Sequence, residues 1–127
     1  MNIKSEELAK YYKQKYPLTF TKGASRKEPF LAERYEAAWK IAKKAATVLK
    51  NNYGARRVVV FGSLTDRSAF TRWSDIDLAV WGVPDNRFYA AVGAVTGLTT
   101  EFKVDLVDAM DCRESLRKAI EIEGIEI

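Results

Sequence analysis

The chain has 127 residues, of which 47% are hydrophobic and 30% charged, a composition typical of one folded domain with a packed core. It contains no histidine and a single cysteine, Cys112, which excludes a Ser–His–Asp triad, an imidazole-bound zinc site and an internal disulfide. The net charge of +4 is unevenly divided, because residues 1–57 carry 14 basic and five acidic side chains, whereas residues 58–127 carry seven basic and 12 acidic ones. Any chemistry must therefore use carboxylates, hydroxyls, Lys, Arg or bound metal.

The chain also lacks the sequence features of a membrane or secreted protein. No apolar run approaches the roughly 18–20 residues needed to span a bilayer. The N-terminal residues lack the apolar stretch of a secretory signal, and a single thiol is compatible with a reducing compartment. We therefore expect a cytoplasmic protein.

The first 56 residues are predicted to be helical. A short helix is expected over residues 6–16, where Ser5 can cap its start and Pro17 ends it. A long helix is predicted over residues 29–51, with lysines on one face and the run Asn-Asn-Tyr-Gly at its end. Its apolar face consists of residues that recur at helical spacing, namely Leu31, Tyr35, Ala38, Trp39, Ala42, Ala46 and Leu49.

From residue 57 onward, short β-branched runs alternate with helical patterns. The predicted strands span residues 58–61, 75–81 and 103–108, and the predicted helices span residues 87–98 and 113–123, followed by a short tail at 124–127. This order predicts a single α+β domain over residues 1–127, with a helical part at 1–56 and a catalytic part of sheet and helices at 57–127.

Two aspartates begin the second predicted strand. Side chains alternate along a strand, so Asp75 and Asp77 point to one face, and the apolar residues between and after them point to the other. Two carboxylates this close repel each other unless a cation lies between them. Mg²⁺ prefers oxygen ligands and often takes only one or two carboxylates, with substrate phosphates and water completing its shell. The pair therefore predicts a site for a metal-bound phosphate.

Residues on the neighbouring strands complete this pattern. Gly62 and Ser63 follow the first strand, where a glycine allows a sharp turn and a hydroxyl can hold phosphate oxygens. The third strand carries Asp105 and Asp108 at odd spacing, so only one of them can share a given face. The flanking Val and Leu favour Asp105, with Asp108 as a strand-end or capping residue. A third carboxylate beside the pair would complete a two-metal site for displacement at phosphorus.

Residues 57–107 resemble the nucleotidyltransferase superfamily related to DNA polymerase beta, and the simplicity of the chain resembles its minimal branch, the MNT proteins. The resemblance is carried by a glycine-serine after one strand, SDIDL on the next, and a lone Asp inside an apolar third strand. It implies a small mixed sheet flanked by helices, ATP as substrate with two Mg²⁺ ions, and transfer of AMP to a hydroxyl. It also implies an antitoxin whose partner is a HEPN-type toxin encoded nearby, modified on a tyrosine.

The same resemblance assigns roles to individual residues. Gly62 and Ser63 match the phosphate-holding pair, Asp75 and Asp77 the paired metal ligands, and Asp105 the third carboxylate. The chain departs from the family directly after the glycine-serine, where residues 64–68 replace a small segment that commonly contains glycine. This departure lies in the loop over the phosphates rather than in the metal site.

The loop before the second strand adds further candidates. Arg67 and Arg72 are equally well explained as solvated charges or as ligands of the triphosphate. For Trp73 and Trp81, which flank the strand, a role in the core or in partner contact is favoured over nucleobase stacking.

Three alternatives to this enzyme remain open at this stage. The first is a non-catalytic binding module that neutralises its partner by forming a complex. The second is a nucleic-acid-binding protein that uses the basic N-terminal half, although no aromatic-plus-basic recognition motif accompanies that charge. The third is an enzyme with the same chemistry acting on a small molecule.

Overall fold

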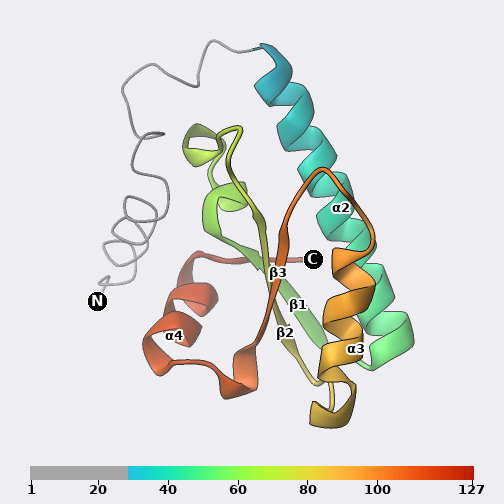
Figure 1. Cartoon of the computed structure of the whole chain (residues 1–127). Helices are drawn as coiled ribbons and strands as arrows, with labels where there is room; N and C mark the ends of the chain where they lie inside the picture. Colours follow the sequence, from blue (N-terminus) through green and yellow to red (C-terminus); the bar gives the residue numbers. More distant parts are fainter. Residues whose placement is uncertain (1–28) are drawn as a thin grey trace.

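The computed structural model describes residues 29–127, which form a four-stranded sheet between helices (Figure 1). The predicted helix at residues 6–16 lies outside the described residues. The elements are, in chain order, α2 (Pro29–Tyr53), β1 (Arg57–Phe61), η2 (Gly62–Thr65), η3 (Arg67–Ala69), β2 (Ile76–Trp81), α3 (Asp85–Thr96), β3 (Val104–Asp108), η4 (Ala109–Asp111), α4 (Glu114–Glu123) and β4 (Ile125–Glu126), where η marks a short 3₁₀ helix.

The sheet is mixed, with the strand order β3-β2-β1-β4. β1 pairs antiparallel with β2 and with β4, whereas β2 and β3 run parallel and are joined by the crossover helix α3. The α+β fold and the mixed sheet expected from the sequence are therefore confirmed. None of the helices in residues 29–127 is long and apolar enough to cross a membrane.

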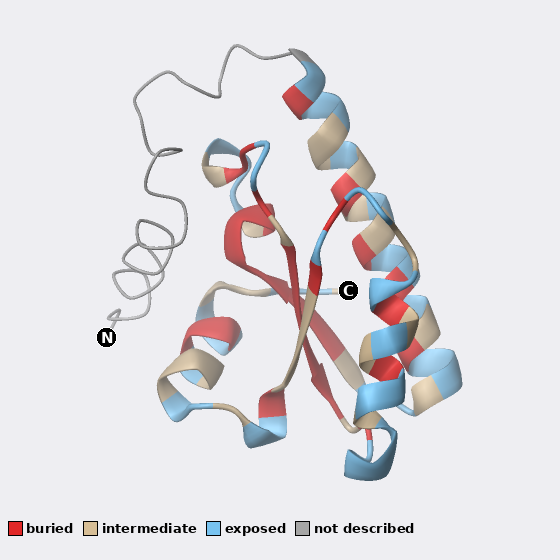
Figure 2. Cartoon of the chain, viewed as in Figure 1, coloured by how far each residue is buried: buried red, intermediate tan, exposed pale blue. Residues whose placement is uncertain are grey.

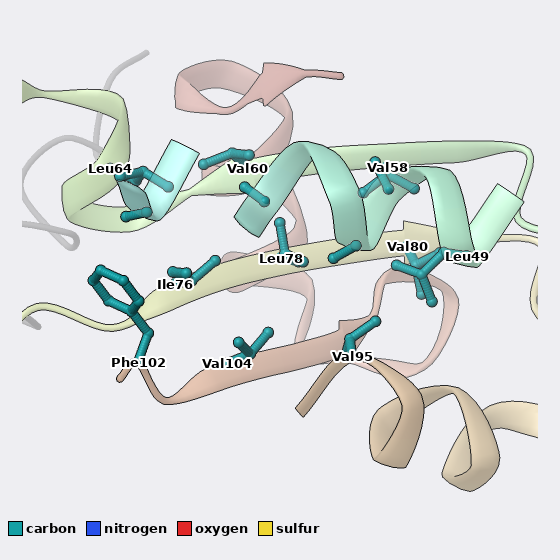
Figure 3. Close-up of a cluster of buried hydrophobic side chains, with 14 of the residues drawn as sticks. Leu49, Val58, Val60, Leu64, Ile76, Leu78, Val80, Val95, Phe102 and Val104 are labelled. Carbon is teal, nitrogen blue, oxygen red and sulfur yellow. The ribbon is translucent and has the colours of Figure 1, made fainter. Parts of the chain in front are cut away.

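One face of the sheet is covered by α2 and α3 and holds the larger part of the core (Figure 1). Every second residue of β1 and β2 points here and is fully buried, and α2 packs small residues such as Ala38 and Ala42 against them. Figure 3 shows these side chains, with Leu49 of α2 and Val95 of α3 meeting the strands. The strand residues on this face are Val58, Val60, Ile76, Leu78, Val80 and Val104.

Within residues 29–127, the opposite face is covered by α4 and by Ala109 of η4, and it has a smaller apolar cluster. Val59, Phe61, Ala79 and Trp81 of the strands pack there with Ile120 of α4. Figure 2 shows that β1 and β2 are almost entirely buried, which is the consequence of covering both faces.

Arg57, the first residue of β1, forms ion pairs with residues of α4 and β4. Its guanidinium group lies 4.4 Å from the centre of the Trp81 ring and forms ion pairs of 3.0 Å with Glu121 and with Glu126. The hydrogen bond to Glu121, together with that to Glu126, raises the pKa of Arg57. Since all three charged groups are partly exposed, this network adds little to stability and mainly orients the chain end.

The predicted tail at residues 124–127 is in fact a short strand, β4, at the edge of the sheet. Val59 pairs with Glu126, and the Ile127 amide donates to the Val58 carbonyl at 3.0 Å. Two residues are too few to show the alternation from which strands are predicted, so only pairing with β1 reveals this one. The other element ends shift by no more than two residues; α2, for example, ends at Tyr53 before Gly54, which has a φ of 78°.

Candidate active site

The turn that follows β1 begins with a glycine in a conformation that other residues rarely adopt. Gly62 has a φ of 83°, in the left-handed region, which lets the chain leave the extended Phe61 and enter the 3₁₀ turn at once. Ser63, the next residue, is only 3% exposed. The sequence prediction of a sharp turn at Gly62 and Ser63 is confirmed.

Hydrogen bonds within this turn fix its shape. The Thr65 hydroxyl donates to the Gly62 carbonyl at 2.7 Å, and the Asp66 amide donates to the Ser63 carbonyl at 3.2 Å. Residues 64–68, where the sequence departs from the family pattern, thus fall at the end of η2 and the start of η3, with Asp66 between the two short 3₁₀ helices. Asp66 caps the second of these by accepting from the Ser68 amide and hydroxyl.

A tyrosine of α2 also binds this turn. The Tyr35 hydroxyl donates to the Leu64 carbonyl at 3.1 Å, and its ring meets Phe70 edge-on, with 5.3 Å between the ring centres. Helical periodicity places Tyr35 correctly on the apolar face of α2, but no pattern in the sequence indicates which carbonyl its hydroxyl binds.

The two strand aspartates lie side by side in the sheet. β2 and β3 are parallel and in register at Asp77 and Asp105, so the two residues are direct neighbours, about 4.8 Å apart between strands. Their chain neighbours, including Ile76 and Leu78, pack toward α2, so both carboxylates belong to the α4 face. Phe61 pairs with Asp77 from the other side, which places Gly62 and Ser63 next to this row.

Exposure differs between the three acidic residues. Asp77 is 3% exposed, whereas Asp75 and Asp105 are partly exposed. Asp75 immediately precedes β2, and ladder pairing starts right after it with the Ile76 amide donating to the Lys103 carbonyl at 2.9 Å. Lys103 also places its ammonium group 3.8 Å from a carboxylate oxygen of Asp105.

The register decides which of Asp105 and Asp108 lies on the face of Asp77. Asp108 lies at the end of β3 and accepts a hydrogen bond of 3.0 Å from the Met110 amide, so it caps η4, as expected. Val104 and Leu106 pack on the core side, which leaves Asp105 on the face of Asp77.

The donor atoms in this row fit Mg²⁺. Within residues 29–127, no three acidic or thiol side chains gather closely enough to hold a metal ion unaided. A buried carboxylate beside a second one nevertheless supplies the one or two oxygen ligands that Mg²⁺ takes when substrate phosphates complete its shell. The turn at Gly62 and Ser63 lies beside this row of residues.

Most of the described residues match a known protein family. The profile described as "Polymerase beta, Nucleotidyltransferase" matches residues 43–127, from the second half of α2 to the end of β4. This chain belongs to the polymerase beta nucleotidyltransferase family. No curated protein sequence matches it significantly.

Solved structures show that the nucleotidyltransferase fold extends over most of the chain. A structure described as the toxin–antitoxin with AMP-PNP has 22% sequence identity and a TM-score of 0.56, and covers 67% of this chain and 70% of that chain. A structure described as the toxin–antitoxin MntA–HepT has 20% identity and a TM-score of 0.52, and covers 69% of both chains. At this identity, the likeness establishes a shared fold.

The remaining candidates of this nucleotidyltransferase lie toward α2. The Arg67 guanidinium is 5.1 Å from the centre of the Tyr35 ring, and that of Arg72 is 5.8 Å from Phe30 and 6.0 Å from Trp73. Because Tyr35 itself binds the turn after β1, Arg67 lies near that turn, and a role of either arginine in triphosphate binding stays a prediction.

The two tryptophans that flank β2 have different environments. Trp81 is 8% exposed and packs in the α4-side cluster, which is the core role predicted for it as one of two alternatives. Trp73 is 61% exposed, which excludes the core role and leaves partner contact as the prediction for it. Trp73 lies in a turn between the buried residues Thr71 and Ser74. The Ser74 hydroxyl accepts a hydrogen bond of 2.9 Å from the Thr71 amide.

Proposed function

We propose that this chain is a Mg²⁺-dependent nucleotidyltransferase that moves AMP from ATP to a hydroxyl of a partner protein. The observation that carries the proposal is the direct register of Asp77 with Asp105, next to the turn at Gly62 and Ser63. Membership of the nucleotidyltransferase family supports the reaction class. The solved structure described with AMP-PNP supports a nucleotide as substrate.

The residues divide the reaction between them. Asp75 and Asp77 would hold the ion that accompanies the nucleotide, and Asp105 would contribute to a second. Bound Mg²⁺ would neutralise the triphosphate and lower the pKa of the acceptor hydroxyl, whose usual value for tyrosine is ~10. The turn at Gly62 and Ser63 holds the β- and γ-phosphates.

In the transfer step, the acceptor oxygen forms a bond to the α-phosphorus as the bond to the bridging oxygen of the β-phosphate breaks. Pyrophosphate leaves in line with the attack, and Asp105 accepts the hydroxyl proton. Positioning and charge neutralisation supply most of the catalysis in such displacements, so this reaction needs no histidine.

The acceptor that we propose is a tyrosine of a HEPN-type toxin encoded nearby, which AMP addition would silence. Two similar structures are described as toxin–antitoxin complexes of MntA and HepT, and these share the fold of this chain. The chain would then act as the antitoxin of such a pair in the cytoplasm.

Replacing Asp77 by Asn tests the reaction. Asp77→Asn keeps the size of the side chain but removes the buried charge, so we expect transfer of AMP to fall by about 100-fold or more while the fold persists. The measurement is the intact mass of the HEPN-type protein encoded beside this gene, after incubation with ATP and Mg²⁺. The matched control is Asp85→Asn, an exposed aspartate beyond the opposite end of β2, which should transfer AMP like the parent.

Calorimetry separates the enzyme from the non-catalytic binding module. The parent protein should bind ATP in the presence of Mg²⁺ and lose this binding when Mg²⁺ is chelated. A parent that forms the toxin complex but binds no ATP would establish the binding module and overturn the enzymatic proposal.

A further inference from the structure

One hydrogen bond joins the phosphate-side turn to the helix behind it. Among residues 29–127, the carbonyls of Gly62 and Ser63 accept from within the loop, whereas the Leu64 carbonyl accepts from Tyr35 of α2. The two partners are 29 residues apart in the chain. The Tyr35 hydroxyl is therefore the polar link through which the helical layer fixes the turn.

The Tyr35 ring is itself held in place by the same loop. Phe70 meets it edge-on at 5.3 Å between ring centres, and the Arg67 guanidinium lies 5.1 Å from its centre. Both residues belong to the loop that leads from Gly62 to β2. A ring held in this way keeps its hydroxyl in one place without further loss of rotamer entropy.

After Tyr35, α2 packs closely against the sheet. Ala38 and Ala42, one and two turns further along, have no exposed surface and pack against the strands. Leu64, whose carbonyl accepts the hydrogen bond, is also fully buried and belongs to the same cluster, as Figure 3 shows. The turn therefore takes its position from the larger of the two apolar clusters.

We propose that Tyr35 is a positioning residue for polyphosphate binding, because its hydroxyl fixes the turn that holds the β- and γ-phosphates. The inference rests on the proposed function, since that function places the phosphates at Gly62 and Ser63. Loss of the hydroxyl leaves the Leu64 carbonyl without this donor and lets the turn move relative to the strand carboxylates. The effect falls on the polyphosphate part of the nucleotide and leaves the nucleoside part unchanged.

Tyr35→Phe is the direct test, because it removes only the hydroxyl and keeps the ring between Phe70 and Arg67. Tyr53→Phe is the matched control. Tyr53 lies on the same helix and is also partly buried under a guanidinium, that of Arg87 at 4.9 Å, but its hydroxyl makes no hydrogen bond with any residue of the described range. Thermal unfolding of both variants establishes that each is folded.

The first readout is binding with Mg²⁺ present, measured by calorimetry. Tyr35→Phe should bind ATP and inorganic tripolyphosphate about fivefold more weakly than the parent, on the scale of one net hydrogen bond, while AMP changes by less than about twofold. Tyr53→Phe should match the parent for all three ligands. Equal tripolyphosphate affinity in Tyr35→Phe and the parent would overturn the positioning role, even if the variant is less stable.

The second readout needs no ligand. Amide hydrogen exchange at residues 63–66 should become severalfold faster in Tyr35→Phe than in Tyr53→Phe, because the turn loses its link to α2. Unchanged exchange would contradict the inference on its own. A parent that binds neither ATP nor tripolyphosphate would instead overturn the proposed function, and the exchange comparison would still decide whether Tyr35 orders the turn.

Discussion

The two faces of the sheet are built from alternating residues of the same strands, yet they serve different purposes. Toward α2 and α3, β2 presents Ile76, Leu78 and Val80, each with no exposed surface. Toward α4, the same strand presents Asp77 and Ala79. One face is continuous hydrocarbon, and the other accommodates a carboxylate between small and aromatic residues.

The difference shows how a short chain combines stability with a charged site. Burying a carboxylate costs free energy unless hydrogen bonds or a counterion compensate it, so a second, fully apolar face is needed to hold the strands in place. Because the period of a strand is two, neighbouring residues fall on opposite faces of the sheet. A residue on the face of the candidate site is therefore followed by one that points into the core. Substitutions on β2 and β3 should therefore sort into losses of activity and losses of stability.

The largest effect is expected from Asp105→Asn, on the face of the proposed site. Removing this carboxylate should slow AMP transfer by about 100-fold or more, because the acceptor hydroxyl loses a charged partner. Asp108→Asn, three residues later on the same strand, should stay within about twofold of the parent, since an Asn oxygen can still accept from the Met110 amide. The measurement is pyrophosphate release in the presence of the partner protein; equal losses in both variants would show that the register does not select the active carboxylate.

A smaller effect, on stability alone, is expected from Leu78→Ala on the opposite face. Leu78 is fully buried in the cluster beneath α2, so truncation should lower the free energy of unfolding by about 2–5 kcal/mol. Chemical denaturation measures this loss. ATP binding well below the unfolding temperature should remain within about twofold of the parent; a loss of binding without a loss of stability would contradict the division between the faces.

The smallest of these effects concerns the close approach of the chain to the α4 side of the sheet at Gly124. A Cβ added there would overlap a methyl group of Val59 and the Ile120 carbonyl oxygen. Gly124→Ala should therefore destabilise the fold by about 1–3 kcal/mol in thermal or chemical unfolding. Gly93→Ala in α3, where nothing lies within 4 Å, is the control and should be neutral or stabilising by about 0.5–1 kcal/mol.

Much of the site was predictable because its residues lie close together in the chain. The glycine before Ser63 and the alternation of Asp75 and Asp77 are local patterns. The turn forms where the glycine indicates, and the strand begins one residue later than predicted, at Ile76, so that Asp75 lies just before it. The choice of Asp105 over Asp108 was also predictable, since its apolar neighbours fix which way it points. The environments of Arg67, Arg72 and Trp73 were not, because an irregular loop has no period from which the direction of a side chain can be read.

The sequence by itself determined strands β1 to β3, helices α2, α3 and α4, the α+β class and which acidic residues are candidates for the site, because periodicity and motif spacing are properties of neighbouring residues. Only the tertiary structure decided that Asp77 lies beside Asp105, that residues 125–126 form an edge strand, and that Tyr35 reaches the Leu64 carbonyl. Each of these depends on a partner far away in the chain. The acidic residues illustrate the same division. The sequence places most carboxylates after residue 57, and the pairing of β2 with β3 brings Asp77 and Asp105 side by side.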